Sequence, residues 1–353
     1  MVTGIIGLGL IGGSVARALK SLGHTVLATS RSEKSLSAAK KEGVIDEYSL
    51  GDLSLFMDCN IVFICTSVDK IPYYAQKLQK LVSNECILTD VGSTKSGIYE
   101  KMLSMGNINF IGGHPMAGSE KTGYFASDVH LLDNAWYILT PLPHVKEEYV
   151  RILTDTVAAM GAKPLLMDPY LHDRCVAAVS HLPHIVASTL VNTVKDLSDK
   201  DGYMHSIAAG GFKDITRIAG SSPEVWSSIC TENKKEIISA LDAFIYRLTQ
   251  IKNNIEKDES TEEFFACARE YRNSFANTLP NSTSERELTV NIADKPGSVA
   301  VVSALLSFED ISIKNIGVIP DPDSDGTLLA IAFATVNDKN RALKLLEKHR
   351  FIG

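Results

Sequence analysis

The stretch Val2-Thr3-Gly4-Ile5-Ile6-Gly7-Leu8-Gly9-Leu10-Ile11-Gly12-Gly13-Ser14 decides the fold of this chain. A short apolar run is followed by Gly-x-Gly-x-x-Gly, and residues 15–20 then continue with a helical pattern. Strand, glycine turn and helix in this order indicate a dinucleotide site. Gly7 permits the tight turn, Gly9 lets the backbone approach a pyrophosphate, and Gly12 lets the helix pack on the strand. The first helical N–H groups would face the phosphates. The predicted cofactor-binding residues of this turn are Gly7, Leu8, Gly9, Leu10, Ile11 and Gly12.

The end of the second predicted strand, 24–29, bears on the choice of cofactor. An Asp or Glu at this place binds the ribose 2′-OH of NAD. The sequence has Ser30-Arg31-Ser32 instead, and small hydroxyls beside a guanidinium suit the 2′-phosphate of NADP. The alternative is that Arg31 is a solvated surface charge. We therefore predict NAD or NADP as cofactor, with a preference for NADP. Ser30, Arg31, Cys65, Thr66 and Ser93 complete the predicted cofactor contacts.

Length and composition predict a soluble globular protein of two or three domains. The chain has 353 residues, 45% of them hydrophobic and 22% charged, which is ordinary for globular proteins. Its net charge of −7 argues against nucleic acid or an anionic membrane as partner. The six cysteines have no metal-ligand spacing, so we predict no metal site. A strand from residue 2 leaves no room for a targeting peptide, and no apolar run suggests a membrane span. We expect a cytoplasmic protein.

The sequence pattern divides the chain into three parts and a linker. Strands and helices alternate over residues 1–165, with helices predicted at 32–43, 72–82 and 145–160. This order predicts an α/β domain with an open parallel sheet. Residues 166–278 have almost only helical periodicity, which predicts a helix at 173–197 and a last helix at 262–277 among others. The apolar faces of these helices suggest pairing with a second copy. Residues 279–286 have the composition of a linker. Residues 287–353 follow the order βαββα, a ferredoxin-like half-pattern.

Two predicted strand ends contain conspicuous polar residues, at the edge where ligands of open α/β sheets bind. One is Asp90-Val91-Gly92-Ser93-Thr94-Lys95, although Ser93 and Thr94 could also cap the next helix. The other is Gly112-Gly113-His114-Pro115. Pro115 favours extended backbone at His114, and the sequence offers no amphipathic helix to bury the ring. We predict an exposed, functional His114, because imidazole suits proton transfer near neutral pH.

The helical part contributes two further motifs. Ser180-His181-Leu182-Pro183-His184 places two imidazoles on one helix face, with Pro183 kinking the backbone between them. In Gly211-Phe212-Lys213-Asp214-Ile215-Thr216-Arg217-Ile218-Ala219 the arginine ends a helix, where it could serve the helix dipole alone. Gly210 and Gly211 instead favour close approach of the backbone to a ligand. Trp226 is, by residue type, more often core than contact.

Taken together and in order, these motifs resemble the prephenate dehydrogenases, a family of tyrosine biosynthesis. The set consists of the glycine turn, Asp90–Lys95, Gly113-His114-Pro115-Met116-Ala117-Gly118-Ser119-Glu120, Ser180–His184 and Gly211–Ala219. The tail, with Asp294-Lys295-Pro296-Gly297-Ser298 and residues 311–318, resembles an ACT domain, a small amino-acid-sensing module. The likeness covers almost the whole chain. It implies a Rossmann-type dinucleotide-binding domain, an all-helical dimerisation domain and a ferredoxin-like α+β ACT domain.

The resemblance also implies a reaction and residue roles. Prephenate loses its ring carboxylate as CO₂ and a hydride from C4, which gives 4-hydroxyphenylpyruvate. His114 would accept the proton or hydrogen bond of the C4 hydroxyl, and Ser93 would orient that hydroxyl. Arg217 would bind a substrate carboxylate, which its planar guanidinium does better than lysine. The other substrate-binding residues implied are His184, near the pyruvyl group, Gly210, Glu120, Asp173 and Trp226. Tyrosine would inhibit through the ACT domain, and the helical domain would form a homodimer.

Other functions remain in competition at the sequence level. Arogenate, the aminated relative of prephenate, is an alternative substrate, although His184 favours the keto acid. A non-catalytic amino-acid sensor on the same scaffold would not need Ser93, His114 and Arg217 together. A β-hydroxyacid or imine-linked dehydrogenase would share the architecture but fits the Gly-His-Pro segment and the paired histidines poorly.

Overall fold

The computed structural model describes residues 1–118, 121–198, 202–277, 286–293, 295–320, 327–333, 335–349 and 351. The chain forms two compact units, Met1–Thr249 and Gln250–Gly353, and each is described here by itself.

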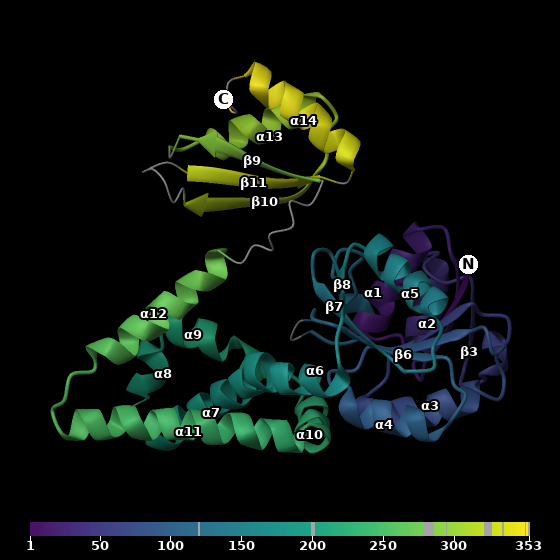
Figure 1. The fold of residues 1–353 in the computed structure, drawn as a ribbon, viewed down its shortest axis with the longest axis horizontal. Coiled ribbons are helices and arrows are strands. Elements are labelled where there is room, and N and C mark those ends of the chain that lie inside the picture. Colours follow the sequence, from purple (N-terminus) through teal and green to yellow (C-terminus); the bar gives the residue numbers. More distant parts are fainter. Residues whose placement is uncertain are drawn as a thin grey trace. The chain divides into compact units, whose positions relative to one another are not determined.

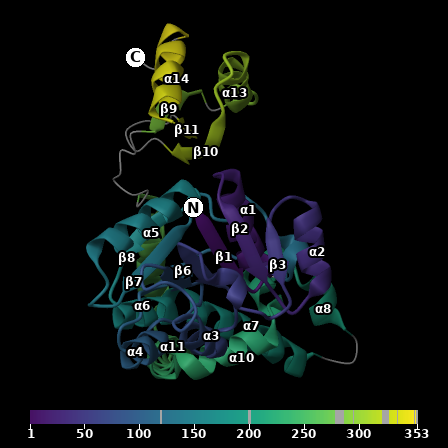
Figure 2. The same ribbon diagram turned by 90° about the vertical axis from the view of Figure 1, so that its right-hand side faces the viewer.

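The first unit is built on an eight-stranded sheet with the order β3-β2-β1-β4-β5-β6-β7-β8 (Figures 1 and 2). Its central strands are fully buried apolar runs, as expected where both faces are covered; β4 is Ile-Val-Phe-Ile without exposure. The strands are β1 Val2–Ile6, β2 Thr25–Thr29, β3 Glu47–Ser49, β4 Ile61–Ile64, β5 Ile87–Asp90, β6 Phe110–Pro115, β7 Trp136–Pro141 and β8 Lys163–Leu166.

The sheet is mixed, so the expected open parallel sheet is wrong for its last two strands. β7 pairs antiparallel with β6, with Ile138 opposite His114, and β8 runs parallel to β7. A parallel crossover needs a dozen or more residues, usually as a helix. Between β6 and β7 the described residues form only the short 3₁₀ turn Tyr124–Ala126, so the chain returns antiparallel. The sequence pattern also does not predict β3 and β8.

Five helices cover the two faces of this sheet (Figure 1). They are α1 Leu10–Ser21, α2 Glu33–Lys41, α3 Ile71–Leu78, α4 Ser96–Ser104 and α5 Glu147–Ala159. Residues of α1, α2 and α5 share one apolar core with the sheet, and residues of α3 and α4 share the other. The predicted helices at 32–43, 72–82 and 145–160 are therefore present, with bounds that differ by one to four residues.

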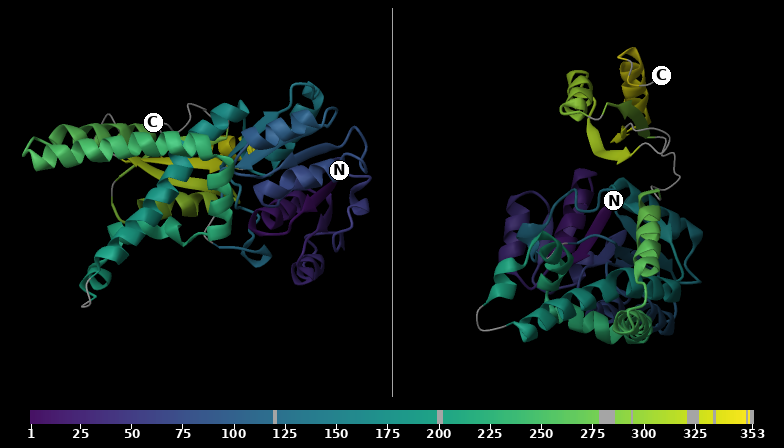
Figure 3. Two further views of the ribbon diagram at one scale, coloured as in Figure 1. Left: turned by 90° about the horizontal axis from the view of Figure 1, so that it is seen from below. Right: turned by 90° about the vertical axis from the view of Figure 1, so that its left-hand side faces the viewer.

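Residues 169–249 of the first unit are helical (Figure 3). The elements are α6 Pro169–Val176, a π-helical turn Ala177–His181, α7 Leu182–Leu197, α8 Tyr203–Ile207, α9 Gly210–Thr216, a 3₁₀ turn Arg217–Gly220, α10 Pro223–Glu232 and α11 Lys234–Glu256, whose end lies in the second unit. The predicted single helix from 173 to 197 is thus interrupted, just before Pro183. Arg217 begins a 3₁₀ turn instead of ending a helix.

This helical part leaves much apolar surface exposed. Its buried apolar cluster consists of Ala177, Ile229 and Ile237, whereas Val179, Ile207 and Ile245 are more than half exposed. The π turn joins α6 and α7 into one run, Pro169–Leu197, that is long and apolar enough to cross a membrane by length and composition. The sequence prediction missed this length. The same run buries His172, Asp173 and His181 in the first unit, although only 22% of its apolar window is buried.

The second unit contains a helix and a small α/β element. Helix α12 spans Glu262–Asn277, as predicted, and the predicted linker lies mostly outside the described residues. The remaining elements are β9 Glu287–Ile292, α13 Ser298–Phe308, β10 Ile313–Pro320, β11 Thr327–Phe333 and α14 Val336–Lys348. The sheet is antiparallel with the order β10-β11-β9. Helices α13 and α14 lie on the same face of it (Figure 2) and share its apolar core, so the predicted order βαββα is present.

Candidate active site

The glycine turn between β1 and α1 is shaped by close backbone contacts. Gly7 has a φ of +97°, and a Cβ at Gly12 would lie 2.0 Å from the carbonyl oxygen of Gly7. A Cβ at Gly9 would meet nothing within 4 Å. Gly12 is therefore needed for packing, while Gly9 faces open space at the N-terminus of α1. Such a cradle, with helical N–H groups around it, fits a pyrophosphate.

Two hollows open on either side of this turn. The first, which we name the His114 cavity, has a volume of about 590 Å³ and includes Ser93, His114, His184, Arg217 and Trp226 in its lining. The second, the Arg31 groove, has the same volume and is lined by Gly7, Leu8, Ser30, Arg31 and Lys70 among others. Both include Gly9, Cys65, Thr66 and Ser67. One extended ligand could thus lie across the turn with an end in each hollow.

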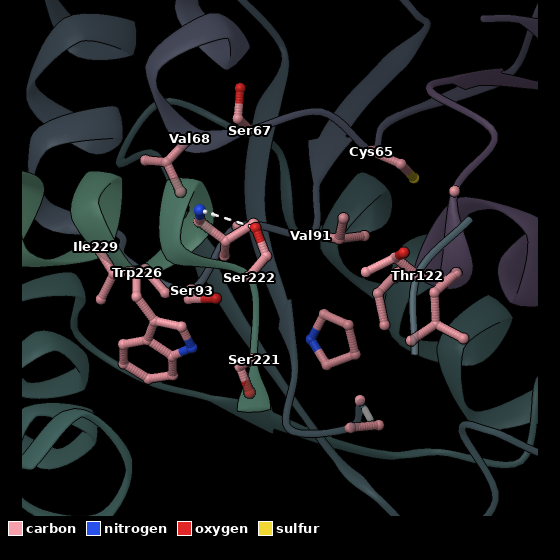
Figure 4. Close-up of a pocket in the computed structure, with 18 of the residues that line it drawn as sticks. Cys65, Ser67, Val68, Val91, Ser93, Thr122, Ser221, Ser222, Trp226 and Ile229 are labelled. Atoms are coloured by element: carbon pink, nitrogen blue, oxygen red, sulfur yellow. Dashed lines mark hydrogen bonds between the residues drawn. The ribbon is translucent and has the colours of Figure 1, made fainter. Parts of the chain in front are cut away.

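The close-up in Figure 4 shows how the walls of the His114 cavity are made. Ser93 and Trp226 lie on one side of the view, and Cys65 and Thr122 lie on the other. Ser222 precedes α10, and its Oγ accepts a hydrogen bond of 3.4 Å from the N–H of Val225. The sheet domain and the helices therefore both contribute to one cavity.

His114 lies at the end of β6 and is buried, with 8% of its surface exposed. The prediction of an exposed ring is wrong, because α6 places His172 against it. His114 Nδ1 and His172 Nε2 are 2.8 Å apart, and the two rings meet edge to face. Burial lowers the pKa of His114 well below its usual value, and the nearby His172, Lys95 and His181 lower it further. The ring is thus a neutral base at physiological pH.

Asp173 connects the helical part to the sheet domain. Its carboxylate accepts hydrogen bonds from the backbone N–H groups of Lys95 and Ser96, at 2.7 and 2.9 Å, and from the Ser96 hydroxyl. It also lies 2.7 Å from His172 Nδ1. Asp173 therefore caps α4, and the alternative that Ser93 or Thr94 caps this helix is wrong. Burial raises the pKa of Asp173, but these hydrogen bonds outweigh burial and lower it.

A buried ion pair lies beside this network. Lys95 and Asp90 are both without side-chain exposure and contact one another directly. Asp90 also accepts hydrogen bonds from the N–H groups of Gly92 and Gly113, at 2.7 and 3.0 Å. Burial lowers the pKa of Lys95, against the attraction of Asp90 and Asp173. The pair thus fixes the loop that contains Ser93 against the strand that contains His114.

His184, Trp226 and Arg217 form the opposite wall. The rings of His184 and Trp226 are stacked with centroids 3.7 Å apart. Burial lowers the pKa of His184, the backbone of Ile218 opposes this, and the charge of Arg217 lowers it further. His184 is therefore a neutral hydrogen-bonding group beside a cation, an arrangement that suits a carboxylate next to a carbonyl.

His181 does not share the position of His184, although the sequence predicts one helix face for both. It is buried, and its Nδ1 lies 3.1 Å from the Asn233 amide nitrogen, which also donates to the Asp173 carbonyl at 2.9 Å. Burial lowers the pKa of His181 to about 4. His181 thus remains neutral and helps to hold α6 against α11.

The structure brings most of the predicted site residues together. The His114 cavity contains Gly9, Leu10, Ile11, Gly12, Cys65, Thr66, Ser93, His114, His184, Arg217 and Trp226, and the Arg31 groove contains Gly7, Leu8, Ser30 and Arg31. Asp173 lies beneath the cavity, with its carboxylate engaged as described. Gly210 is exposed at the start of α9 and is not among the described lining residues. Glu120 lies outside the described residues.

The sequence reasoning gave no role of their own to four polar residues of this region, which are His172, Lys95, Asp90 and Asn233. They are buried here, whereas residues of these types are mostly exposed in proteins. The pair His172-Asp173, which follows the N-cap Asp168 by four and five residues, could have indicated these contacts. It places two neighbouring polar side chains in the first turns of a helix.

Comparisons with known proteins agree on one family. Residues 15–166 match the family model "Prephenate dehydrogenase, nucleotide-binding domain", and residues 168–270 match "Prephenate dehydrogenase, dimerization domain". Prephenate dehydrogenase of Bacillus subtilis is 34% identical over 97% of this chain and 95% of its own. The enzyme of Lactococcus lactis is 33% identical over 98% of this chain and 97% of its own.

Solved structures give the same result. A prephenate dehydrogenase from A. aeolicus, crystallised with hydroxyphenyl propionate and NAD⁺, is 31% identical with a TM-score of 0.73. It covers 78% of this chain and 98% of its own. Synechocystis arogenate dehydrogenase is 32% identical over 78% of this chain and all of its own, with a TM-score of 0.68. The chain belongs to the prephenate dehydrogenase family of nicotinamide-dependent oxidoreductases.

Proposed function

We propose that this enzyme converts prephenate to 4-hydroxyphenylpyruvate and CO₂, with NAD⁺ or NADP⁺ as oxidant. The observation that supports this most is the neutral His114 ring in a cavity that also contains Ser93, His184 and Arg217. Because His114 Nδ1 is bonded to His172, Nε2 is the nitrogen left to face a ligand.

The chemistry needs one base that takes a proton and returns it. His114 Nε2 accepts the proton of the C4 hydroxyl, while Ser93 orients that hydroxyl. When bound, the nicotinamide supplies the acceptor for the hydride from C4. The bond between the ring and its carboxylate then breaks, its electron pair makes the ring aromatic, and CO₂ leaves. His114 returns its proton to the oxygen on C4, so no net proton is consumed. A placed base of this kind contributes about 10²–10⁴ to the rate.

The wall opposite His114 binds the substrate. Arg217 holds a carboxylate with two N–H groups, which fixes its orientation as well as its charge. His184 is held flat against Trp226 and lies beside the keto acid side chain. The family resemblance alone assigns Gly210 and Glu120 to substrate binding as well. Asp173 acts on this site through its contacts with Lys95, Ser96 and His172.

The cofactor would lie across the glycine turn. The open space at Gly9 and the helical N–H groups of α1 suit its pyrophosphate. In the Arg31 groove, Ser30 and Arg31 occupy the place of the acid that selects NAD, and Lys70 adds a second cation. Among its described lining residues the groove has no Asp or Glu. These features favour NADP.

The test is the initial rate with prephenate and with arogenate, each against NAD and NADP. We expect one reduced nicotinamide and one CO₂ for each prephenate consumed, and a higher kcat/KM with NADP. Absence of reduced nicotinamide with prephenate and either cofactor would contradict the proposal.

Arogenate is the second candidate substrate. A Zymomonas mobilis relative named cyclohexadienyl dehydrogenase, 30% identical over 72% of this chain, and the Synechocystis arogenate enzyme favour this possibility. His184 favours prephenate, because a site matched to a keto group leaves an ammonium without its partners.

We also propose the domain limits 1–165, 166–278, 279–286 and 287–353, and assign the last as an ACT domain that binds tyrosine. The family-model matches meet at residues 166 and 168. The βαββα order and the left-handed Gly297 (φ +93°) before α13 support the ACT assignment. Tyrosine should inhibit non-competitively with prephenate, and phenylalanine should not. Purely competitive inhibition would place tyrosine in the His114 cavity instead.

The exposed apolar side chains of the helical part support a homodimer. Val179, Ile207 and Ile245 are 70%, 74% and 55% exposed, and large exposed apolar patches mark interaction surfaces. Replacing Val179 and Ile245 with Glu should convert the dimer to a monomer in sedimentation experiments.

A further inference from the structure

Asp173, His172 and His114 are joined by two consecutive hydrogen bonds beneath the cavity. We propose that His172 is a positioning residue: it fixes His114 in the tautomer that has its proton on Nδ1 and its free electron pair on Nε2, facing the substrate. The inference rests on the proposed function and adds to it a residue outside the cavity lining described above.

The argument begins at Asp173, whose protonation state is determined by its partners. Its two carboxylate oxygens accept from the N–H of Lys95, the N–H of Ser96 and the Ser96 hydroxyl. Backbone N–H groups can only donate, and these hydrogen bonds, with that from His172, favour the charged form and lower the pKa of Asp173, so its carboxylate is ionised. Asp173 is therefore an acceptor toward every neighbour.

The next step follows from hydrogen-bond complementarity. His172 Nδ1 lies 2.7 Å from Asp173 Oδ1, so this nitrogen must be the donor. A neutral imidazole with a proton on Nδ1 has an acceptor at Nε2. Burial keeps His172 neutral by lowering its pKa, although the bond to Asp173 opposes this.

The last step transfers this polarity to the catalytic ring. His172 Nε2 lies 2.8 Å from His114 Nδ1, so His114 must donate from Nδ1. A neutral His114 then has its acceptor at Nε2, which is the state a base needs before it takes a proton. In the opposite tautomer Nε2 would already have a proton, and the first step could not occur.

The chain of contacts also stabilises the product of that step. When His114 takes the substrate proton it becomes cationic, in a buried position near Lys95 and His181. A hydrogen bond from its Nδ1 to an acceptor backed by the Asp173 carboxylate offsets part of this cost. His172 thus acts on the proton-accepting step and not on substrate binding.

Two variants of His172 separate a positioning role from a structural one. His172→Asn places an amide where Nδ1 was, so it keeps the contact with Asp173 but does not reach His114. His172→Gln places an amide oxygen near the former Nε2, so it can still accept from His114. We expect kcat to fall about 10–100-fold in His172→Asn. The kcat of His172→Gln should be about tenfold higher than that of His172→Asn. The KM values for prephenate and cofactor should change less than about threefold, since a transition-state effect appears in kcat.

Two controls make the test specific. His144→Asn removes an exposed imidazole, whose Nε2 lies 2.9 Å from the Ile108 carbonyl, before β6 begins, and should leave kcat unchanged. His114→Asn tests the proposed function itself. Loss of turnover in His114→Asn together with full kcat in both His172 variants overturns the positioning role alone. Full turnover in His114→Asn overturns the proposed function.

A measurement on the unchanged enzyme does not depend on the folding of any variant. In ¹⁵N-histidine-labelled protein near pH 7.5, NMR should show His114 protonated at Nδ1 with Nε2 free. A proton on Nε2 of His114 overturns the inference.

Discussion

The His114 cavity and the Arg31 groove share Gly9 of the glycine turn and the residues Cys65, Thr66 and Ser67 after β4, but they differ in how they are built. Buried imidazoles and the ion pair of Asp90 and Lys95 lie at the cavity. The hydrogen bond between Asp173 and His172 determines the direction of the bond between His172 and His114. The groove has exposed cations and small hydroxyls with few restraints. From this difference we expect chemistry and cofactor choice to be separable in this enzyme. Variants of the cavity should change turnover with either cofactor, and variants of the groove should change the cofactor ratio with any substrate.

The largest effect should come from the turn that both hollows share. Gly12→Ala forces a Cβ within 2.0 Å of the Gly7 carbonyl oxygen, and this contact involves backbone that cannot move easily. We expect no measurable turnover and a free energy of unfolding lower by about 1–3 kcal/mol, measured by urea titration. Gly9→Ala is the matched control, because its Cβ meets nothing. It should fold as wild type but bind cofactor weakly. Equal stability of the two variants would contradict the geometry.

The next effect concerns the cavity alone. Arg217→Leu should lower kcat/KM for prephenate about 10²–10³-fold with both cofactors, because a substrate carboxylate loses its charged partner. Arg217→Lys should recover part of this, since it keeps the charge without the two-pronged contact. Steady-state kinetics checks both variants. A change in the NADP to NAD ratio would show that cavity and groove are not independent.

A smaller effect is expected in the groove. Arg31→Ser should lower kcat/KM with NADP about tenfold and leave kcat/KM with NAD within about twofold, as expected for one exposed charge pair. The measurement is the ratio of the two values at fixed prephenate. An unchanged ratio would mean that Arg31 is only a surface charge.

The most gradual effect is the pH dependence of stability. The pKa of His181 is about 4 in the folded state and 6.5 in its ordinary state, so the unfolded chain binds more protons between these values. The free energy of unfolding should therefore decrease as the pH falls from about 6.5 toward 4. His114 and His172 act in the same direction, and Asp173 adds to it at lower pH. Both tryptophans, Trp136 and Trp226, lie in the first unit, so their fluorescence reports on this unit. Stability independent of pH over this range would contradict the neutral buried imidazoles.

Sequence reasoning predicted the parts of this molecule that depend on local pattern. The glycine turn, the buried strands and helix α12 follow from spacing and periodicity over a few residues. The strand-end position of His114 also follows, because Pro115 and the paired glycines act locally. The antiparallel β7 and the strands β3 and β8 did not follow from local pattern, because strand direction depends on how the chain crosses the sheet.

The network beneath the cavity was beyond local pattern for a similar reason. Along the chain, His172 lies 58 residues from His114, which it contacts. Asp173 lies 78 residues from Lys95, whose N–H it binds. Which residue caps α4, and which ring buries His114, depends on the packing of α6 against the sheet domain. Residue type alone therefore indicated exposed positions for groups that the fold buries.

The central claim is that His114 Nε2 takes the proton of the substrate hydroxyl. Asn at position 114 keeps a donor where Nδ1 was, so the contact with His172 can persist while the base is removed. The decisive measurement is the single-turnover rate of nicotinamide reduction in His114→Asn, at saturating prephenate and cofactor. We predict a rate lower by about 10²–10⁴-fold with unchanged dissociation constants for both ligands. A rate equal to that of the wild type would contradict the claim.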